Sequence, residues 1–161
     1  MAPVNSFHAD TTALEVAAEF KDQIRGKNIL VTGTYPRGLG AATARAIASE
    51  GPALLILTYR TKEKVDQVVA ELQATYPDVK VQTLELDLAS TESVRAAAKE
   101  LNSKISHLDI LINNAGVMSL QELTLTKEGV EMHFATNHIG HFLFTNLILG
   151  KLVAASRKAR P

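Results

Sequence analysis

Apolar side chains recur along the chain in two alternating patterns. Short and almost uninterrupted apolar runs, such as Ile29-Leu30-Val31 and Leu54-Leu55-Ile56-Leu57, are typical of strands that helices cover on both faces. Longer stretches between these runs carry apolar residues at spacings of three and four, which is the period of an amphipathic helix. The alternation predicts a series of β-α units and therefore a parallel sheet.

These patterns also predict the order of the elements. Strands are expected at residues 28–32, 53–59, 79–86 and 108–112, and helices at 39–50, 62–76, 91–103 and, as a long final helix, about 127–156. Crossovers between parallel strands are right-handed, which places helices on both faces of the sheet. The predicted fold class is therefore α/β, with a doubly wound Rossmann-type parallel sheet of about four strands in the order 3-2-1-4. Sheets of this type have six or more strands, so this one is expected to be incomplete.

The residues before the first strand, 1–26, are expected to form a leading helical segment. Thr12 and Glu15 have the spacing of a capping box, which predicts a short helix that ends near Phe20. Residues 27–161 contain no repeat of fixed period and no linker rich in glycine, serine or proline. With 161 residues, of which 46% are hydrophobic, the chain is expected to hold a single domain with a sizeable core.

Composition narrows the classes of partner. Seventeen basic residues balance seventeen acidic ones, so no net charge favours nucleic acid or anionic lipid. The absence of cysteine excludes disulfides and cysteine-ligated zinc. Acidic residues interrupt each apolar run among the first thirty residues, so no secretory signal is expected and a cytoplasmic location is the default. The apolar run at 139–155 contains His141, Asn146 and Lys151 and is shorter than the roughly 20 residues of a membrane span, so none is expected.

A glycine-rich loop lies between the first predicted strand and its helix. Its residues are Thr32-Gly33-Thr34-Tyr35-Pro36-Arg37-Gly38-Leu39-Gly40. Glycines at such a turn let the backbone approach a pyrophosphate, and the N-terminus of the following helix attracts the negative charge. The alternative is a plain strand-to-helix turn. Because the loop follows a buried strand and opens a helix, phosphate binding is the preferred interpretation.

A second small turn, Asn113-Asn114-Ala115-Gly116, follows the fourth predicted strand, where open α/β sheets bind ligands. With both turns in this order, the chain resembles the short-chain dehydrogenase/reductase family from about residue 27 to residue 152, and in particular its retinol-dehydrogenase-like branch. The resemblance implies the amino-terminal, cofactor-binding half of a family member. In the family the glycine loop has three residues between Thr-Gly and the next glycine. Here it has four, including Arg37, whose guanidinium could bind phosphate.

The end of the second predicted strand indicates which dinucleotide is bound. NAD-binding sites tend to carry an acidic residue there, about 20 positions after the loop, whereas this chain has Arg60. A guanidinium binds a 2′-phosphate in a bidentate manner, which favours NADP (NADPH) as the cofactor. The alternative is that Arg60 is a solvated residue at the start of a helix.

The resemblance implies further cofactor contacts. The predicted cofactor-binding set is Thr32, Gly33, Arg37, Gly38, Leu39, Gly40, Arg60, Asp87, Leu88, Asn114, Ala115 and Gly116. Asp87 would lie near the adenine amino group, and the alternative is that it is only a helix-start acid, which the helix dipole favours. No metal site is predicted, because His138 and His141 have no third ligand beside them.

The long predicted helix carries a candidate catalytic residue. Apolar residues at spacings of three and four surround Asn137, which predicts that it faces protein rather than water. The segment from Thr136 to Phe142 resembles the family helix whose asparagine holds a water-linked proton path to the catalytic lysine. The resemblance therefore implies a catalytic role for Asn137. A structural asparagine that bonds a neighbouring strand is the alternative.

The rest of the family's chemistry is not found in the sequence. Tyr76 and Lys80 match the catalytic Tyr-x-x-x-Lys spacing, but Pro77 is unfavourable inside a helix and both residues precede the Asn113 turn. This match is interpreted as a coincidence. No tyrosine follows Asn137, so the chain is expected to be truncated before the catalytic tyrosine and lysine and to be catalytically incomplete.

Three functions stay open at this point. The first is an NADP(H)-dependent oxidoreductase that transfers hydride between nicotinamide and a small carbonyl or alcohol substrate, which the resemblance suggests is lipophilic. The second is a dinucleotide-binding or interaction module without turnover, and the third is a product with no stable fold. The fourth strand would be an exposed edge beneath an apolar helix, so a homo-oligomer through residues 127–156 is a candidate assembly.

Overall fold

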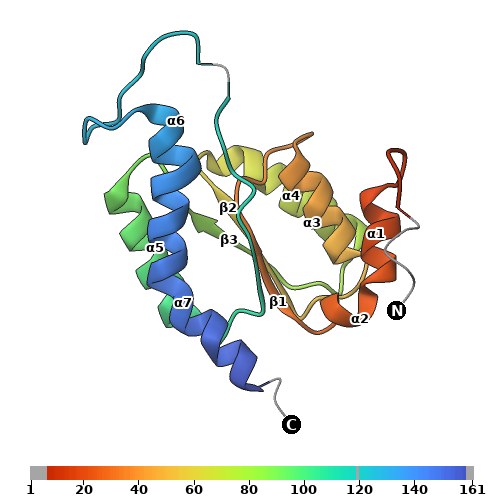
Figure 1. Ribbon diagram of the computed structural model, residues 1–161. Helices are drawn as coiled ribbons and strands as arrows, with labels where there is room; N and C mark the ends of the chain where they lie inside the picture. Colours follow the sequence, from red (N-terminus) through yellow and green to blue (C-terminus); the bar gives the residue numbers. More distant parts are fainter. Residues whose placement is uncertain (1–6, 119, 159–161) are drawn as a thin grey trace.

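A parallel sheet lies at the centre of the computed structural model, which describes residues 7–118 and 120–158. Its strands are β1 (Asn28–Val31), β2 (Leu54–Tyr59), β3 (Val81–Glu85) and β4 (Ile110–Ile112). They follow the order β3-β2-β1-β4 (Figure 1), which confirms the predicted topology. Val31 pairs with Leu57 on one side and with Ile112 on the other, so the carboxyl ends of these strands meet near one edge of the sheet.

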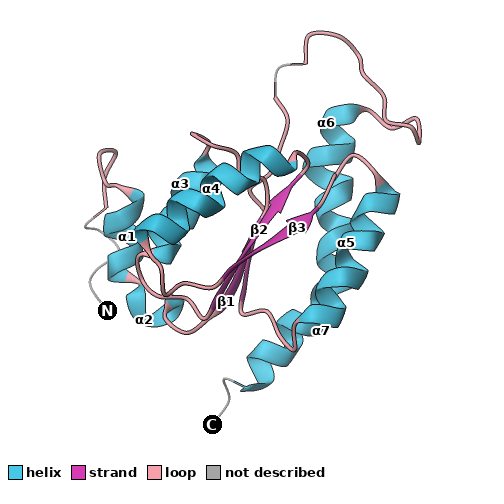
Figure 2. Ribbon diagram, turned by 180° about the vertical axis from the view of Figure 1, so that it is seen from behind, coloured by secondary structure: helices cyan, strands magenta, loops and turns pink. Residues whose placement is uncertain are grey.

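Helices cover both faces of the sheet, as Figures 1 and 2 show. One layer contains α1 (Ala13–Glu19), α2 (Lys21–Ile24), α3 (Leu39–Ala48) and α4 (Lys62–Thr75), and the other contains α5 (Thr91–Lys104) and α7 (His141–Lys158). Alternate residues of β1 supply the two cores, because successive side chains of a strand point to opposite faces. Ile29 and Val31 pack in the cluster of α3 and α4, whereas Leu30 packs with α5 and α7.

The described part of the leading segment, residues 7–26, contains α1 and α2 and begins with a non-helical stretch, and residues 1–6 of the predicted range 1–26 lie outside the described residues. Thr12 and Glu15 form the predicted capping box, in which the Thr12 N–H donates to Glu15 Oε2 at 2.7 Å. These bonds lower the pKa of Glu15. Ala17 and Ile24 are buried in the same apolar cluster as α3, so the segment packs on the domain.

The long final helix begins later than predicted. It starts at Met132 rather than near residue 127, because the chain turns at Gly129 (φ 76°) and Leu125 pairs with Glu131 in an isolated antiparallel bridge. Its first part is α6 (Met132–Phe134), followed by a π-helical segment, η2 (Ala135–Gly140), and then by α7. A π-helical turn changes the direction in which later side chains point.

The apolar part of the same helix is longer than the sequence predicted. Met132–Arg157 is 26 residues long, and by length and composition alone it is apolar enough to cross a membrane. The core helix of a soluble protein meets the same criteria. Phe144 and Ile148 are fully buried against the sheet and α5, and Lys151 donates to the Ile105 carbonyl at 2.6 Å. The absence of a membrane span stays a prediction.

The β4 side of the sheet is more open than its centre. Ile110, Leu111 and Ile112 are each half-buried, because β4 has no described neighbour on its outer edge. Phe142, Leu149 and Val153 of α7 are exposed on the surface of the helix. An edge strand and an apolar helix face of this kind are the features that the sequence predicted for the fourth β-α unit.

Candidate functional site

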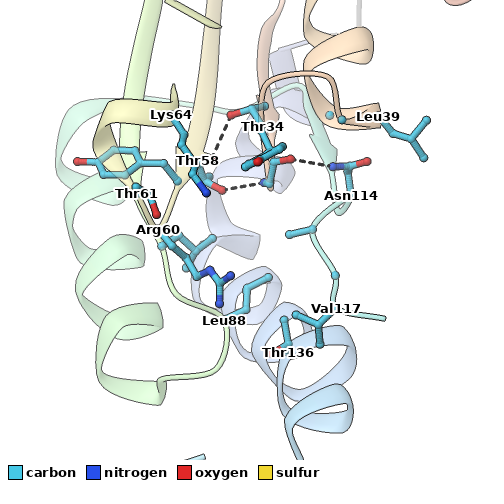
Figure 3. Close-up of a pocket in the computed structure, with 18 of the residues that line it drawn as sticks. Thr34, Leu39, Thr58, Arg60, Thr61, Lys64, Leu88, Asn114, Val117 and Thr136 are labelled. Carbon is cyan, nitrogen blue, oxygen red and sulfur yellow. Dashed lines mark hydrogen bonds between the residues drawn. The ribbon is translucent and has the colours of Figure 1, made fainter. Parts of the chain in front are cut away.

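A cavity of about 520 Å³ opens at the carboxyl ends of β1 and β2 (Figure 3). Its wall combines the glycine loop, the end of β2, the start of α4 and the turn after β4. The lining residues are Gly33, Thr34, Tyr35, Gly38, Leu39, Gly40, Thr58, Tyr59, Arg60, Thr61, Lys64, Leu86, Leu88, Asn114, Ala115, Gly116, Val117, Met118 and Thr136. The volume lies in the range of small-molecule and cofactor sites.

The start of the glycine loop is bound to β2. The Gly33 N–H donates to Thr58 Oγ1 at 3.2 Å, and Thr34 Oγ1 donates to the Thr58 carbonyl at 3.1 Å (Figure 3). Gly33 has a φ of 70°, and a Cβ there would lie 2.7 Å from Ala115 Cα. Glycine at this position therefore permits both the left-handed backbone and the close approach of the second turn.

The additional residue of the loop is accommodated in a β-turn at Tyr35-Pro36-Arg37-Gly38. The Gly38 N–H donates to the Tyr35 carbonyl at 2.9 Å, and Arg37 has a φ of 64°. Proline at the second position and a positive φ at the third are typical of a type II turn. A non-glycine residue in this conformation costs about 1 kcal/mol. Arg37 is exposed and is not among the lining residues, so its predicted phosphate contact stays a prediction.

The N-terminus of α3 faces this loop. Gly38 is the N-cap and no side chain caps the first turn, so the turn's free N–H groups are available to an anion. Gly40 brings α3 close to both turns, because a Cβ there would lie 2.5 Å from the Gly33 carbonyl oxygen and 2.6 Å from Asn114 Nδ2. The geometry fits a phosphate cradle built from backbone donors.

The two predicted turns are joined through Thr32. Its hydroxyl oxygen accepts the N–H groups of Asn114 and Ala115, both at 2.9 Å, and its side chain is fully buried. Asn114 in turn donates through Nδ2 to the carbonyls of Thr32 at 2.8 Å and Gly33 at 3.2 Å. Thr32 therefore positions the cavity wall from behind without lining it.

His141 anchors the second turn to α7, a role that the sequence reasoning missed. Its Nε2 lies 2.8 Å from the Ala115 carbonyl oxygen and its Nδ1 lies 3.0 Å from Asn113 Oδ1. Asn113 Nδ2 donates to Thr145 Oγ1 at 3.2 Å, one helical turn further along α7. The sequence signal was the presence of a histidine among apolar helix residues, and it was considered as a metal ligand, not as an anchor of the turn.

Asn137 lies in η2, and its side chain is exposed, so the prediction that it faces protein was wrong. The π-helical segment turns Thr136 and Gly140 inward instead, and a Cβ on Gly140 would lie 2.3 Å from the Leu88 carbonyl oxygen. Asn137 nevertheless has partners. Its Oδ1 accepts the Val117 N–H at 2.8 Å and its Nδ2 donates to the Val117 carbonyl at 2.9 Å. These bonds hold the segment after Gly116 against the helix, although their partner is a loop residue and not the neighbouring strand of the structural alternative. The catalytic role of Asn137 stays a prediction.

The basic end of the cavity lies at β2 and α4. Arg60, Thr61 and Lys64 line it, and the Lys64 ammonium lies 4.7 Å from the centroid of the Tyr35 ring. The sequence reasoning missed Tyr35 and Lys64. Tyr35 belongs to the additional part of the loop, and Lys64 follows Arg60 by one helical turn.

Leu86 and Leu88 line the cavity beyond β3, whereas Asp87 does not. The Asp87 carboxylate accepts the Ala89 N–H at 3.0 Å, and its own N–H donates to Ser93 Oγ at 2.9 Å. These contacts are typical of a helix-start acid, which was one of the two interpretations. The predicted contact with adenine stays a prediction.

Tyr76 and Lys80 lie outside the cavity. Tyr76 ends α4, and the Lys80 carbonyl accepts the Leu55 N–H at 2.9 Å, next to the amino end of β2. The cavity is at the carboxyl ends of the strands, so this Tyr-x-x-x-Lys match is at the opposite edge of the sheet. Within residues 7–118 and 120–158, no group of three histidine, cysteine or acidic side chains could hold a metal ion.

Comparisons with known proteins agree with this arrangement. A model of the short chain dehydrogenase family matches residues 27–160. The chain is 43% identical over 142 residues to an oxidoreductase of Fusarium equiseti, fscI, covering 88% of this chain and 55% of that protein. It is 44% identical over 130 residues to human retinol dehydrogenase 11, covering 81% of this chain and 40% of that protein.

Two solved structures share the fold. A metagenomic short-chain oxidoreductase in complex with NADP superposes with a TM-score of 0.69 at 28% identity, covering 83% of this chain and 59% of that one. L-sorbose reductase from Gluconobacter frateurii, complexed with NADPH and L-sorbose, has a TM-score of 0.69 at 25% identity, and the match covers 81% of this chain and 49% of that one. The chain thus spans about half the length of the proteins it matches.

Proposed function

The chain belongs to the short chain dehydrogenase family, and from this premise we propose that it binds NADP(H) as the cofactor-binding half of an oxidoreductase. The reaction would be hydride transfer between nicotinamide and a carbonyl or alcohol substrate. One observation carries the proposal. The glycine loop, Arg60 and the Asn114 turn, which are far apart in the sequence, line a single cavity.

The backbone of this chain would bind the cofactor's pyrophosphate. The uncapped first turn of α3 offers N–H donors, and the positive end of the helix dipole favours an anion there. Gly38, Leu39 and Gly40 line this part of the wall, and Arg37 stands on the adjacent turn. The cofactor, when bound, supplies or accepts the hydride, and these residues supply binding and orientation.

Arg60 would recognise the 2′-phosphate. It lies at the end of β2 on the cavity wall, and among the described lining residues there is no acidic side chain that would repel a phosphate. The NADP and NADPH complexes of the two solved structures support this choice of cofactor. Leu86 and Leu88 would form an apolar wall for the adenine ring, with Asp87 behind them.

The turn after β4 would form the other end of the site. Ala115 and Gly116 line it, and Asn137 fixes the next residue, Val117, through both of its backbone groups. By family membership Asn137 would also act in proton transfer, which the exposure of its side chain allows. The retinol dehydrogenase relative supports a lipophilic substrate, as does the exposed side chain of Met118, which lines this end.

A second function, a dinucleotide-binding module without turnover, is favoured by one specific observation. The described cavity wall contains no tyrosine with a lysine one helical turn after it, since Tyr76 and Lys80 lie at the other edge of the sheet. We therefore propose that this chain by itself binds NADPH without consuming it. A cytoplasmic location, and self-association through the exposed residues of α7, are further parts of the proposal.

Titration of the purified chain into NADPH, followed by nicotinamide fluorescence, tests binding. The same samples then receive a panel of aldehydes and ketones, including lipophilic ones, while absorbance at the nicotinamide band is recorded. Saturable binding without consumption supports the proposal for this chain. Consumption would refute its incompleteness, and absence of binding would refute NADP(H) as the cofactor.

A further inference from the structure

Two basic side chains, Arg60 and Lys64, line the cavity, and no acidic residue that the structure describes draws either of them away from it. Lys64 has Arg60 four residues before it and Val68 four residues after it, so no acid at helical spacing competes for its charge. Lys62, only two residues away, binds Asp66 at 2.8 Å within the same helix. The described residues include no carboxylate partner for Arg60 or Lys64.

The glycine loop holds Lys64 at the cavity wall. The ammonium lies 4.7 Å from the centroid of the Tyr35 ring, a distance at which the π-face attracts a cation. Tyr35 is the first residue of the turn that accommodates the additional loop residue, in which Arg37 has a φ of 64°. Strained backbone at a ligand site often serves the geometry of that site.

The surroundings of Lys64 suit an anion. Thr61 is the N-cap of α4, but its side chain makes no capping hydrogen bond. The Lys64 N–H donates to the Thr61 carbonyl at 3.2 Å, whereas the Thr61 hydroxyl and the N–H groups of Lys62 and Glu63 have no partner among the described residues. Arg60, Thr61 and Lys64 all line the cavity beside the end of β2 (Figure 3). A guanidinium, an ammonium, a hydroxyl and a helix N-terminus together form a receptor for a phosphate rather than for neutral ribose hydroxyls.

We propose that Lys64, held by the ring of Tyr35, is a second ligand of the cofactor's 2′-phosphate beside Arg60 and sets the preference for NADP(H). This inference rests on the proposed function, because it concerns one end of the same cavity. It adds Tyr35 of the glycine loop and Lys64 of α4, which neither residue spacing nor the glycine pattern had indicated as contributors to cofactor binding.

Isothermal titration with 2′,5′-ADP and 5′-AMP tests the pair, because these ligands differ only in the 2′-phosphate. We expect Lys64→Gln to weaken 2′,5′-ADP about 10-fold and to change 5′-AMP less than about twofold. Lys62→Gln is the matched control: it removes the same charge from the same helix turn but from an ion pair outside the cavity. Lys62→Gln should change the affinity for either ligand less than about twofold.

The role of Tyr35 is tested by a double-mutant cycle. Tyr35→Leu should weaken 2′,5′-ADP about threefold, and Tyr35→Phe, which keeps the ring, should bind like the wild type. In the Lys64→Gln background, Tyr35→Leu should have no further effect. Thermal melts of each variant establish that the fold is retained.

The outcomes separate this inference from the proposed function. Equal losses for the two ligands in Lys64→Gln, or a Tyr35→Leu effect that persists without Lys64, would overturn the inference. Wild-type protein that binds 5′-AMP and 2′,5′-ADP equally would overturn it too, while leaving dinucleotide binding intact. Wild-type protein that binds neither ligand would overturn both.

Discussion

The two ends of the cavity are built differently. At the β2 end, the loop is fastened to Thr58, two cations line the wall, and Thr34 is only 3% exposed. At the β4 end, the wall is mostly backbone held from behind by Thr32, Asn137 and His141, and Met118 is 86% exposed. The β2 end therefore presents charged side chains, which would recognise the adenosine phosphates of the proposed cofactor, whereas the β4 end presents a scaffold that would face its nicotinamide half.

The largest expected effect is on the free energy of unfolding, and it concerns Thr32, the residue that joins the two ends of the cavity. Thr32→Val removes the buried hydroxyl that accepts the N–H groups of Asn114 and Ala115, so the Ala115 N–H loses its partner and the Asn114 N–H keeps only the Ile112 carbonyl at 3.0 Å. We expect the free energy of unfolding in urea to fall by about 3 kcal/mol. Thr32→Ser keeps the hydroxyl and should lose less than about 1 kcal/mol through its missing methyl group. Equal losses in the two variants would show that the hydroxyl does not join the turns.

The next effect isolates the β2 end. Arg60→Glu should weaken NADPH about 100-fold, because an attraction to phosphate becomes a repulsion, while NADH should change by less than about threefold. Fluorescence titration of both nucleotides measures this difference. Arg95→Glu makes the same charge change on the exposed side of α5 and should affect neither ligand. A loss shared by NADPH and NADH would contradict recognition of the 2′-phosphate by Arg60.

A smaller effect isolates the β4 end. Asn137→Ala removes both hydrogen bonds to the backbone of Val117, so the wall beside Gly116 should loosen. We expect NADPH and NADH to weaken by the same factor, about fivefold, since this end does not contact the 2′-phosphate. Asn146→Ala, which removes an asparagine bonded within α7 at Phe142, is the control. A selective loss of NADPH would contradict the division between the two ends.

The smallest effect lies in the segment that leads to α6. Backbone N–H groups of His133 and Phe134 donate to the Glu131 carboxylate and lower its pKa to about 2. A lowered pKa adds stability above the ordinary value, 4.5, that is lost as the pH falls toward about 2. Glu131→Gln should therefore reduce the pH dependence of unfolding in this window, measured by acid titration of the helical signal.

The sheet and the two turns that line the cavity could be predicted from the sequence, because both depend on local signals. Apolar runs and crossover handedness predicted the strand order, and Gly33, Gly40 and Asn114 were identified from turns whose geometry requires them. The positions of individual side chains were harder to predict from the sequence. The π-helical segment rotated Asn137 to the surface, which a regular helical period cannot represent, and Gly129 delayed the start of the helix.

Contacts between residues that are far apart in the sequence could not be predicted from residue spacing. Tyr35 meets Lys64, and His141 meets Ala115, only after the sheet brings their elements together. For Asp87 the family resemblance implied a contact with adenine; its carboxylate accepts the Ala89 N–H of its own turn, and the adenine contact stays a prediction.

The most direct test of the difference between the two ends compares NADPH with 2′,5′-ADP, which lacks the nicotinamide half. If the chain recognises mainly the adenosine phosphates, 2′,5′-ADP should bind within about fivefold of NADPH by isothermal titration, a difference of about 1 kcal/mol. NADPH that binds more than about 100-fold tighter than 2′,5′-ADP would contradict this account, because the nicotinamide end would then supply most of the affinity.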